Sequence, residues 1–189
     1  MEYRLATLDD LEHIIQMRIK YLTEINNKLS EKEKGALLSH LPGYYQRHMG
    51  KDFFAYLAMD GETPASTVFL LIIERPANLN FITGKTAILL NVYTCPEYRK
   101  RGLASVLLQM AVADAKKLNV SNIELQATEM GIPLYEKLGF THKQSQHTYM
   151  EYRFDTPGQY SPEALKFLKI GVCWYMESHF PALSKFFRR

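Results

Sequence analysis

The chain has 189 residues, of which 47% are hydrophobic and 23% charged, and this is the size and composition of one ordinary globular domain. Its formal net charge of +3 is too small to indicate nucleic-acid binding unless the basic residues gather on one face. Its two cysteines, Cys95 and Cys173, lie far apart in the sequence, which argues against a disulfide framework and against a zinc site.

The N-terminal segment has no features of a leader. Residues 1–5 include charges every few positions, and nowhere does the chain contain about eighteen consecutive apolar residues. We therefore expect a soluble, cytoplasmic protein with no membrane partner, no nucleic-acid partner and no metal.

The first half of the chain is predicted to form a strand, two helices and two further strands. Thr7 or Asp9 is suited to cap the first helix, because acidic residues fill its first turn. Ser30 opens the second helix, which Pro42 and Gly43 are expected to break. The predicted ranges are a strand at 3–6, a helix ending near residue 25, a helix at 30–41, a strand at 53–59, a turn at 60–61 and a strand at 66–73.

The second half alternates strands and helices after a loop at 75–85. The helix predicted at 102–118 has a regular apolar face, suited to packing on a sheet. Gly139 is expected to end a short helix. The other predicted ranges are a strand at 86–94, a strand at 122–127, a short helix at 132–138, and a hairpin of 140–143 with 147–154.

The last part of the chain is predicted to be a helical tail. Thr156-Pro157-Gly158 indicates a boundary, and Ser161-Pro162 is typical of a helix start. The predicted domains are therefore residues 1–154 and a C-terminal extension of residues 155–189. The apolar side of the tail must be covered by its own domain or by a second subunit, as in a homodimer. A membrane surface is a weaker alternative, because basic residues are few.

The most informative stretch is residues 98–104, which follow a predicted strand and open a helix. A tight loop leading into a helix directs unpaired backbone N–H groups and the positive end of the helix dipole at one place. Gly102 lets a ligand approach closely, Ala104 is small, and the run Arg99-Lys100-Arg101 adds positive charge. The pattern indicates a phosphate site, with a solvated basic turn as the alternative.

A second motif follows in residues 128–140, which read Thr-Glu-Met-Gly-Ile-Pro-Leu-Tyr-Glu-Lys-Leu-Gly-Phe. Together the two motifs resemble the GCN5-related N-acetyltransferase (GNAT) superfamily. In that family, a strand, an Arg/Gln-Xaa-Xaa-Gly-Xaa-Gly/Ala loop and a helix precede a strand and a Leu-Tyr-Glu-Lys-Leu-Gly-Phe-like helix. The resemblance is strongest over residues 87–143. It implies an α/β (α+β) fold, the GNAT fold, with a mixed, twisted sheet of about six or seven strands and helices on both faces.

The resemblance also implies acetyl-CoA as cosubstrate. Its pyrophosphate would lie on the backbone N–H groups of residues 101–104, and its pantetheine arm along the strand that ends at residue 94. Thr128 stands where many relatives carry an Asn that contacts this arm, although its hydroxyl is also suited to cap the short helix. The implied binding residues are Val92, Tyr93, Thr94, Arg99, Lys100, Arg101, Gly102, Leu103, Ala104 and Thr128.

For catalysis, the resemblance implies direct attack by an amine, without a covalent enzyme intermediate. Tyr135 matches the family position that protonates the departing thiolate, and a buried aromatic on the sheet edge is the alternative. A backbone N–H of the 92–93 region is suited to stabilise negative charge on the thioester oxygen. Asn91 should face a hydrogen-bonding neighbour or the acceptor cleft, and Cys95 is a packed thiol rather than a nucleophile. Several residues could act as the base: Glu24, Glu97, Glu129, His147 and Glu151.

We therefore predict an N-acetyltransferase that uses acetyl-CoA and an amine-bearing acceptor, either a small molecule or a protein amino group. The resemblance directs attention to residues 21–29 and 144–149 for the acceptor cleft, although neither stretch contains a recognisable code. Two alternatives stay open. One is a non-catalytic acyl-CoA-binding sensor that retains the loop, and the other is a nucleic-acid binder, which rests on mild basicity alone.

Overall fold

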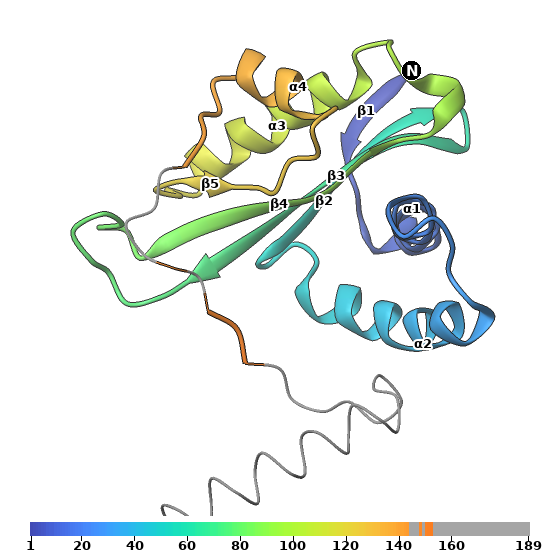
Figure 1. Ribbon diagram of the computed structural model, residues 1–189, viewed down its shortest axis with the longest axis horizontal. Coiled ribbons are helices and arrows are strands. Elements are labelled where there is room, and N and C mark those ends of the chain that lie inside the picture. Colours follow the sequence, from blue (N-terminus) through green and yellow to red (C-terminus); the bar gives the residue numbers. More distant parts are fainter. Residues whose placement is uncertain (144–147, 149, 153–189) are drawn as a thin grey trace, which may run out of the picture. The chain divides into compact units, whose positions relative to one another are not determined.

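The computed structural model describes residues 1–143, 148 and 150–152, and Met1–His142 form one compact unit. A five-stranded sheet has the order β1-β2-β3-β4-β5 (Figure 1). Its neighbouring strands are antiparallel, except for the parallel pair β4 and β5. In chain order the elements are β1 (Glu2–Leu5), η1 (Leu8–Asp10), α1 (Leu11–Ile25), α2 (Glu31–His48), β2 (Phe53–Asp60), β3 (Thr63–Glu74), β4 (Lys85–Thr94), η2 (Pro96–Tyr98), α3 (Leu103–Lys117), β5 (Ile123–Glu124) and α4 (Ile132–Lys137).

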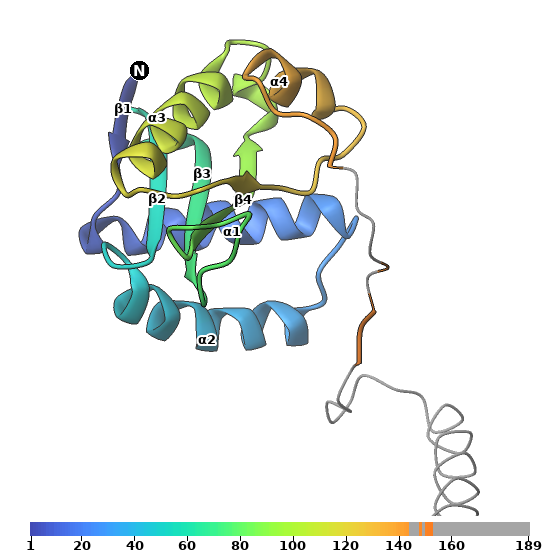
Figure 2. The same ribbon diagram turned by 90° about the vertical axis from the view of Figure 1, so that its left-hand side faces the viewer.

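Helices cover both faces of the sheet, with α1 and α2 on one face and α3 and α4 on the other (Figures 1 and 2). Strand β2 is buried on both sides. Its Ala55 and Leu57 pack in the cluster with α1 and α2, whereas Tyr56 and Ala58 pack in the cluster with α3. Because side chains alternate along a strand, an apolar run such as β2 supplies two cores at once. The predicted mixed sheet with helices on both faces is therefore confirmed.

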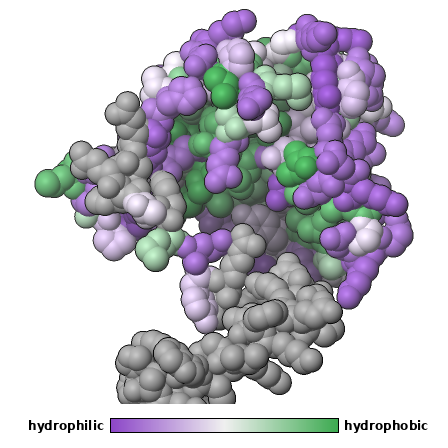
Figure 3. Space-filling view, viewed as in Figure 1, coloured by the Kyte–Doolittle hydropathy of each residue, from purple (hydrophilic) through white to green (hydrophobic). Residues whose placement is uncertain are grey.

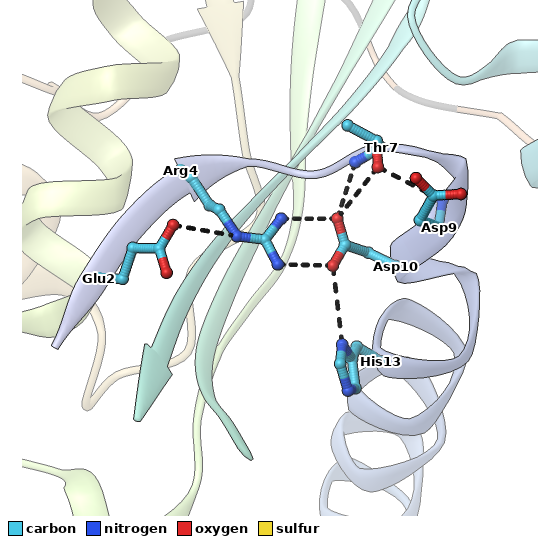
Figure 4. A network of polar contacts seen from close by, with 6 residues as sticks. All are labelled: Glu2, Arg4, Thr7, Asp9, Asp10 and His13. Atoms are coloured by element: carbon cyan, nitrogen blue, oxygen red, sulfur yellow. Dashed lines mark hydrogen bonds and ion pairs between the residues drawn. The ribbon is translucent and has the colours of Figure 1, made fainter. Parts of the chain in front are cut away.

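A polar network holds β1 to the start of α1 (Figure 4). The guanidinium of Arg4 donates two hydrogen bonds to the carboxylate of Asp10, both of 2.6 Å, and the backbone N–H of Thr7 donates a third at 2.9 Å. Asp10 is only 6% exposed, and these bonds, those of Arg4 above all, lower its pKa to about 2. Thr7, one of the two residues predicted to cap the first helix, caps the short helix η1 that leads directly into α1. The start of α1 is thus fixed against the sheet.

Helix α2 begins as predicted and ends later than predicted. Ser30 and Glu33 form a capping box at its start. The expected break at Pro42 is wrong, because α2 continues to His48. A proline inside a helix lacks one N–H donor and costs stability. Beyond it, however, Tyr45 is only 2% exposed and packs with the aromatic side chains of the α1 and α2 core. Burial on the sheet therefore outweighs the local cost.

Strand β4 carries two irregularities that open its second half. A bulge interrupts its pairing with β3 between Leu90 and Tyr93, and Asn91 within it has a φ of +50°. On the other side, β4 pairs with β5 only at Ala87 and Ile88. Among the described residues, the backbone groups of β4 that face β5 after Ile88 therefore have no neighbouring strand.

The strand count differs from the prediction. Strand β5 is shorter than the expected 122–127, and residues 140–143 form no strand. The N–H of Phe140 donates instead to the carbonyl of Tyr135, which folds this residue back onto α4. Five strands therefore occur in the part of the chain that the structure describes, rather than six or seven. The other half of the predicted hairpin, residues 147–154, lies partly outside the described residues, and the predicted tail lies wholly outside them.

The surface seen in Figure 3 is mostly hydrophilic, with hydrophobic atoms exposed on the loop between β3 and β4 at the left. In this loop Leu79 is 95% exposed and Ile82 72%. Within the described ranges no helix combines the length and the apolar character needed to cross a bilayer. Nor do three or more His, Cys, Asp or Glu side chains gather there as a metal site would require.

Candidate active site

The end of β4, the short helix η2 and the start of α3 enclose a pocket with a volume of about 280 Å³. Gly102 stands at the N-cap of α3 with a φ of +78°, and Lys100 before it has a φ of +62°. Both residues adopt the left-handed conformation, which turns the chain sharply from strand into helix. The lining residues are Thr94, Tyr98, Arg99, Lys100, Arg101, Gly102, Leu103, Ala104, Ser105 and Leu134.

Backbone N–H groups at this corner have no acceptor among the described residues. No side chain caps α3, and the first backbone bond of the helix runs from Val106 to the carbonyl of Gly102. A Cβ placed on Gly102 would meet no atom within 4 Å. The amides of residues 102–104 therefore face open space at the positive end of a helix, an arrangement that suits an anion.

The basic side chains around the pocket differ in how they are held. Arg99 donates to both carboxylate oxygens of Glu24, at 2.7 and 2.6 Å, and to the carbonyl of Thr94 at 3.0 Å. Arg101 donates to the carbonyl of Glu97. Lys100, by contrast, has no hydrogen bond or ion pair to another described residue. Arg99 therefore braces α1 against the loop, and Lys100 is the cation left for a ligand.

The last residues of β4 lead into this pocket. Tyr93 is buried, and burial above all raises its pKa to about 12. Ser66 donates to the carbonyl of Tyr93 at 2.9 Å and lies 2.8 Å from the hydroxyl of Thr94. Thr94 lines the pocket, whereas Val92 and Tyr93 do not. These contacts order the end of β4 on its β3 side, and no strand of the described residues pairs with its other side beyond Ile88.

Tyr135 lies on α4 and is 9% exposed. Its ring packs edge-on against Phe140, with 6.0 Å between the ring centres. Burial, with a smaller effect of Tyr21, raises its pKa to about 12. Its neighbour Leu134 lines the pocket, but Tyr135 does not. The hydroxyl therefore stays protonated.

Comparisons with known proteins decide the family. A family model described as Acetyltransferase (GNAT) family matches residues 19–140, well over half of the chain. The protein belongs to the GNAT family. It is therefore an acetyl-CoA-dependent acetyltransferase. A comparison with curated proteins finds no significant match.

Solved structures of other GNAT-like proteins share the fold. A predicted acetyltransferase from Clostridium acetobutylicum, solved with acetyl-CoA, is 24% identical with a TM-score of 0.69, over 80% of this chain and 95% of that one. A GCN5-related N-acetyltransferase from Ralstonia eutropha is 23% identical with a TM-score of 0.60, over 79% and 97%. An aminoglycoside 6'-N-acetyltransferase from Acinetobacter haemolyticus is 20% identical with a TM-score of 0.59, over 82% and 100%.

The structure shows the contacts of two further residues of this GNAT protein, Thr128 and Cys95, for which the sequence predicted a role. The carbonyl of Thr128 accepts the N–H of Gly131, but its hydroxyl does not cap α4, so the predicted capping role is wrong. Cys95 is buried, and burial raises the pKa of its thiol. It lies 3.9 Å from the sulfur of Met17 and 3.6 Å from Lys20 Nζ, which agrees with the prediction of a packed thiol.

No candidate base among the described residues is singled out by its surroundings. Glu24 is occupied by Arg99, and Glu97 and Glu129 are exposed. His147 lies outside the described residues. Asn91 was predicted to face a neighbour or the acceptor cleft, and its side chain meets Arg18 of α1. No local pattern predicts this pair, since 73 residues separate its members. A polar residue within an apolar strand was the one available signal.

Proposed function

We propose that this acetyltransferase transfers the acetyl group of acetyl-CoA directly to the amino group of a small molecule or a protein, in a ternary complex. One observation carries the proposal: the uncapped start of α3 opens onto a pocket beside the free edge of β4. That pocket joins an anion-binding helix start to a strand edge. Acetyl-CoA, which has a diphosphate and an amide-containing arm, needs both features.

The proposed diphosphate site consists of the amides of residues 101–104. Several N–H groups at a helix start bind a phosphate without help from side chains. Open space at the missing Cβ of Gly102 leaves room for phosphate oxygens close to the backbone. Lys100 and Arg101 add charge at the rim, and Arg99 acts mainly through Glu24 by holding the loop.

The proposed arm site is the β4 edge at Val92, Tyr93 and Thr94. Because β5 ends early, the outward backbone groups there lack a neighbouring strand among the residues that the structure describes. An amide-containing arm can pair with them as an added strand would. Affinity then comes chiefly from main-chain groups. A hydroxyl at Thr128 is a further proposed contact to the arm.

Acetyl-CoA supplies an activated acetyl thioester, and the protein must orient the acceptor and handle protons. A primary amine with a pKa near ~10.4 must lose a proton before it can attack. A backbone N–H of the Val92 and Tyr93 region is the proposed donor to the thioester oxygen. Water or an exposed carboxylate near the cleft is the proposed route for the amine proton.

Tyr135 is the proposed donor to the sulfur. Its pKa of about 12 lies well above the value of ~8.5 typical of a thiol. Complete proton transfer from the phenol to a thiolate is therefore uphill. We infer that Tyr135 acts chiefly by a strong hydrogen bond to the developing charge, and that solvent completes the protonation.

Replacing the hydroxyl tests this role. For Tyr135→Phe we expect roughly a ten- to hundred-fold lower kcat, the range of one hydrogen bond to a charge, and an unchanged Kd for acetyl-CoA. Thiol release and calorimetric titration measure the two quantities. Tyr56→Phe is the matched control, because this core hydroxyl bonds Asp114 instead. An unchanged kcat in Tyr135→Phe would remove Tyr135 from the mechanism.

A further inference from the structure

A second polar cluster lies on the face of the sheet covered by α1 and α2. Arg18 of α1 donates from Nη1 to Oδ1 of Asn91 at 3.2 Å. The guanidinium also lies 5.7 Å from the ring centre of Tyr21, and Tyr21 packs edge-on against Tyr93 of β4. The cluster thus joins α1 to the part of β4 where the acetyl group is proposed to arrive.

Asn91 is unusual in both backbone and side chain. It is 3% exposed, and its φ of +50° places it within the bulge of β4. Its Oδ1 faces Arg18, which fixes the orientation of the amide, because the opposite orientation would set donor against donor. Its Nδ2 is buried and has no hydrogen-bond partner within the part of the chain that the structure describes. A buried donor without an acceptor is costly and rare in native proteins, which points to a partner that binds there.

Arg18 is a half-buried cation without an acidic partner. Arg4 and Arg99 each hold a carboxylate, but no carboxylate of the described residues lies within 4 Å of Arg18. Its guanidinium is held by Asn91 and Tyr21 and keeps donors free. A guanidinium fixed in this way matches the planar, bidentate geometry of a carboxylate.

We propose that Arg18 binds a carboxylate of the acceptor, so that the preferred acceptors are small amines bearing a carboxylate group. Asn91 is a positioning residue that aims the guanidinium, and its free Nδ2 is a donor for the bound acceptor. This inference rests on the proposed function, since it assigns the substrate class of the same site. Asn91 directly precedes the Val92 to Thr94 edge, so an acceptor held by Arg18 lies beside the proposed path of the acetyl arm.

The test uses acceptors in matched pairs, each an amino acid and its carboxamide. These molecules differ in the anionic group and share the amine. Wild-type protein is expected to favour the carboxylate member by about tenfold or more in kcat/KM, as a charge-assisted contact to arginine implies. Arg18→Met should abolish this preference and leave the KM for acetyl-CoA unchanged. Arg47→Met, which removes an exposed arginine of α2, should retain it.

A second variant keeps the proposal testable if Arg18→Met folds poorly. Asn91→Asp preserves shape and tolerates the left-handed backbone, but it adds a carboxylate next to Arg18 that competes with the acceptor. We expect a higher KM for carboxylate acceptors, with little change for carboxamides. A purely structural role for Asn91 would affect both members equally.

The outcomes separate the two proposals. Equal turnover of both members of every pair by wild-type protein, or a preference that survives Arg18→Met, overturns the carboxylate inference and leaves amine acetylation standing. Failure of wild-type protein to release thiol with any amine overturns the proposed function as well.

Discussion

At the scale of single residues, Gly102 is the residue on which the proposed diphosphate site for acetyl-CoA depends most. Its φ of +78° is strained for any residue with a Cβ, so Gly102→Ala should lower the free energy of unfolding by about 1 kcal/mol. The added methyl group would also occupy the open space where we place the diphosphate. The Kd for acetyl-CoA should rise about tenfold or more, as calorimetric titration can measure.

Gly61 provides the matched control for this change. It has a φ of +60° in the β2–β3 turn, and a Cβ there also meets no atom within 4 Å. Gly61→Ala should therefore show a similar loss of stability with an unchanged Kd for acetyl-CoA. Equal affinities in the two variants would mean that no ligand approaches Gly102.

The backbone geometry and the burial of a residue could be predicted from the sequence where the residue belongs to a local motif. Gly102 and Tyr135 belong to such motifs, and the backbone geometry of one and the burial of the other follow from their local surroundings. The partners of Arg99 and Asn91 could not be predicted. Glu24 is 75 residues from Arg99 and Arg18 is 73 residues from Asn91, so each pair exists only after α1 has packed on the sheet.

At the scale of elements, the ion pair of Arg4 and Asp10 determines how α1 begins. Asp10→Asn removes the charge that receives both guanidinium bonds, and we expect the free energy of unfolding to fall by about 2 to 3 kcal/mol. Denaturant unfolding measures this change. Glu2→Gln is the control, since Glu2 contacts the same arginine at 3.4 Å but is 67% exposed, and its loss should cost under about 0.5 kcal/mol.

The same pair predicts an acid dependence. The pKa of Asp10 is about 2 in the folded protein, below its ordinary value of 3.8, so the unfolded chain takes up the proton first. The contribution is fully present above the ordinary pKa and is lost as the pH falls towards 2. Unfolding curves of wild type and Asp10→Asn should therefore converge over this range. A constant difference between them down to pH 2 would contradict the assignment.

Elements with strong local signals were predicted well, and those that depend on packing were not. The capping residues Thr7 and Ser30 act as predicted. Helix α2 continues through Pro42 because aromatic side chains beyond it are buried. Strand β5 is short, and residues 140–143 fold back on α4. None of these three features could be predicted from the sequence, because each depends on contacts between elements.

At the scale of the whole described unit, the sheet separates the proposed acetyl-CoA site from the proposed acceptor site. The α3 side presents an uncapped helix start for an anion, and the α1 side presents Arg18 and Asn91. The second half of β4 lies between them. This arrangement suits the transfer of an acetyl group from acetyl-CoA on one side to an acceptor on the other. A cytoplasmic location, and a homodimer formed through residues 155–189, stay predictions.

The corner between β4 and α3 is where we propose that the diphosphate of acetyl-CoA binds. The most direct measurement is a backbone amide NMR titration of the full chain with acetyl-CoA. We expect the largest chemical-shift changes at the amides of Arg101, Gly102, Leu103 and Ala104, with further changes along Val92 to Thr94. Binding that leaves these four amides unshifted, or no binding at all, would mean that this corner is not the diphosphate site.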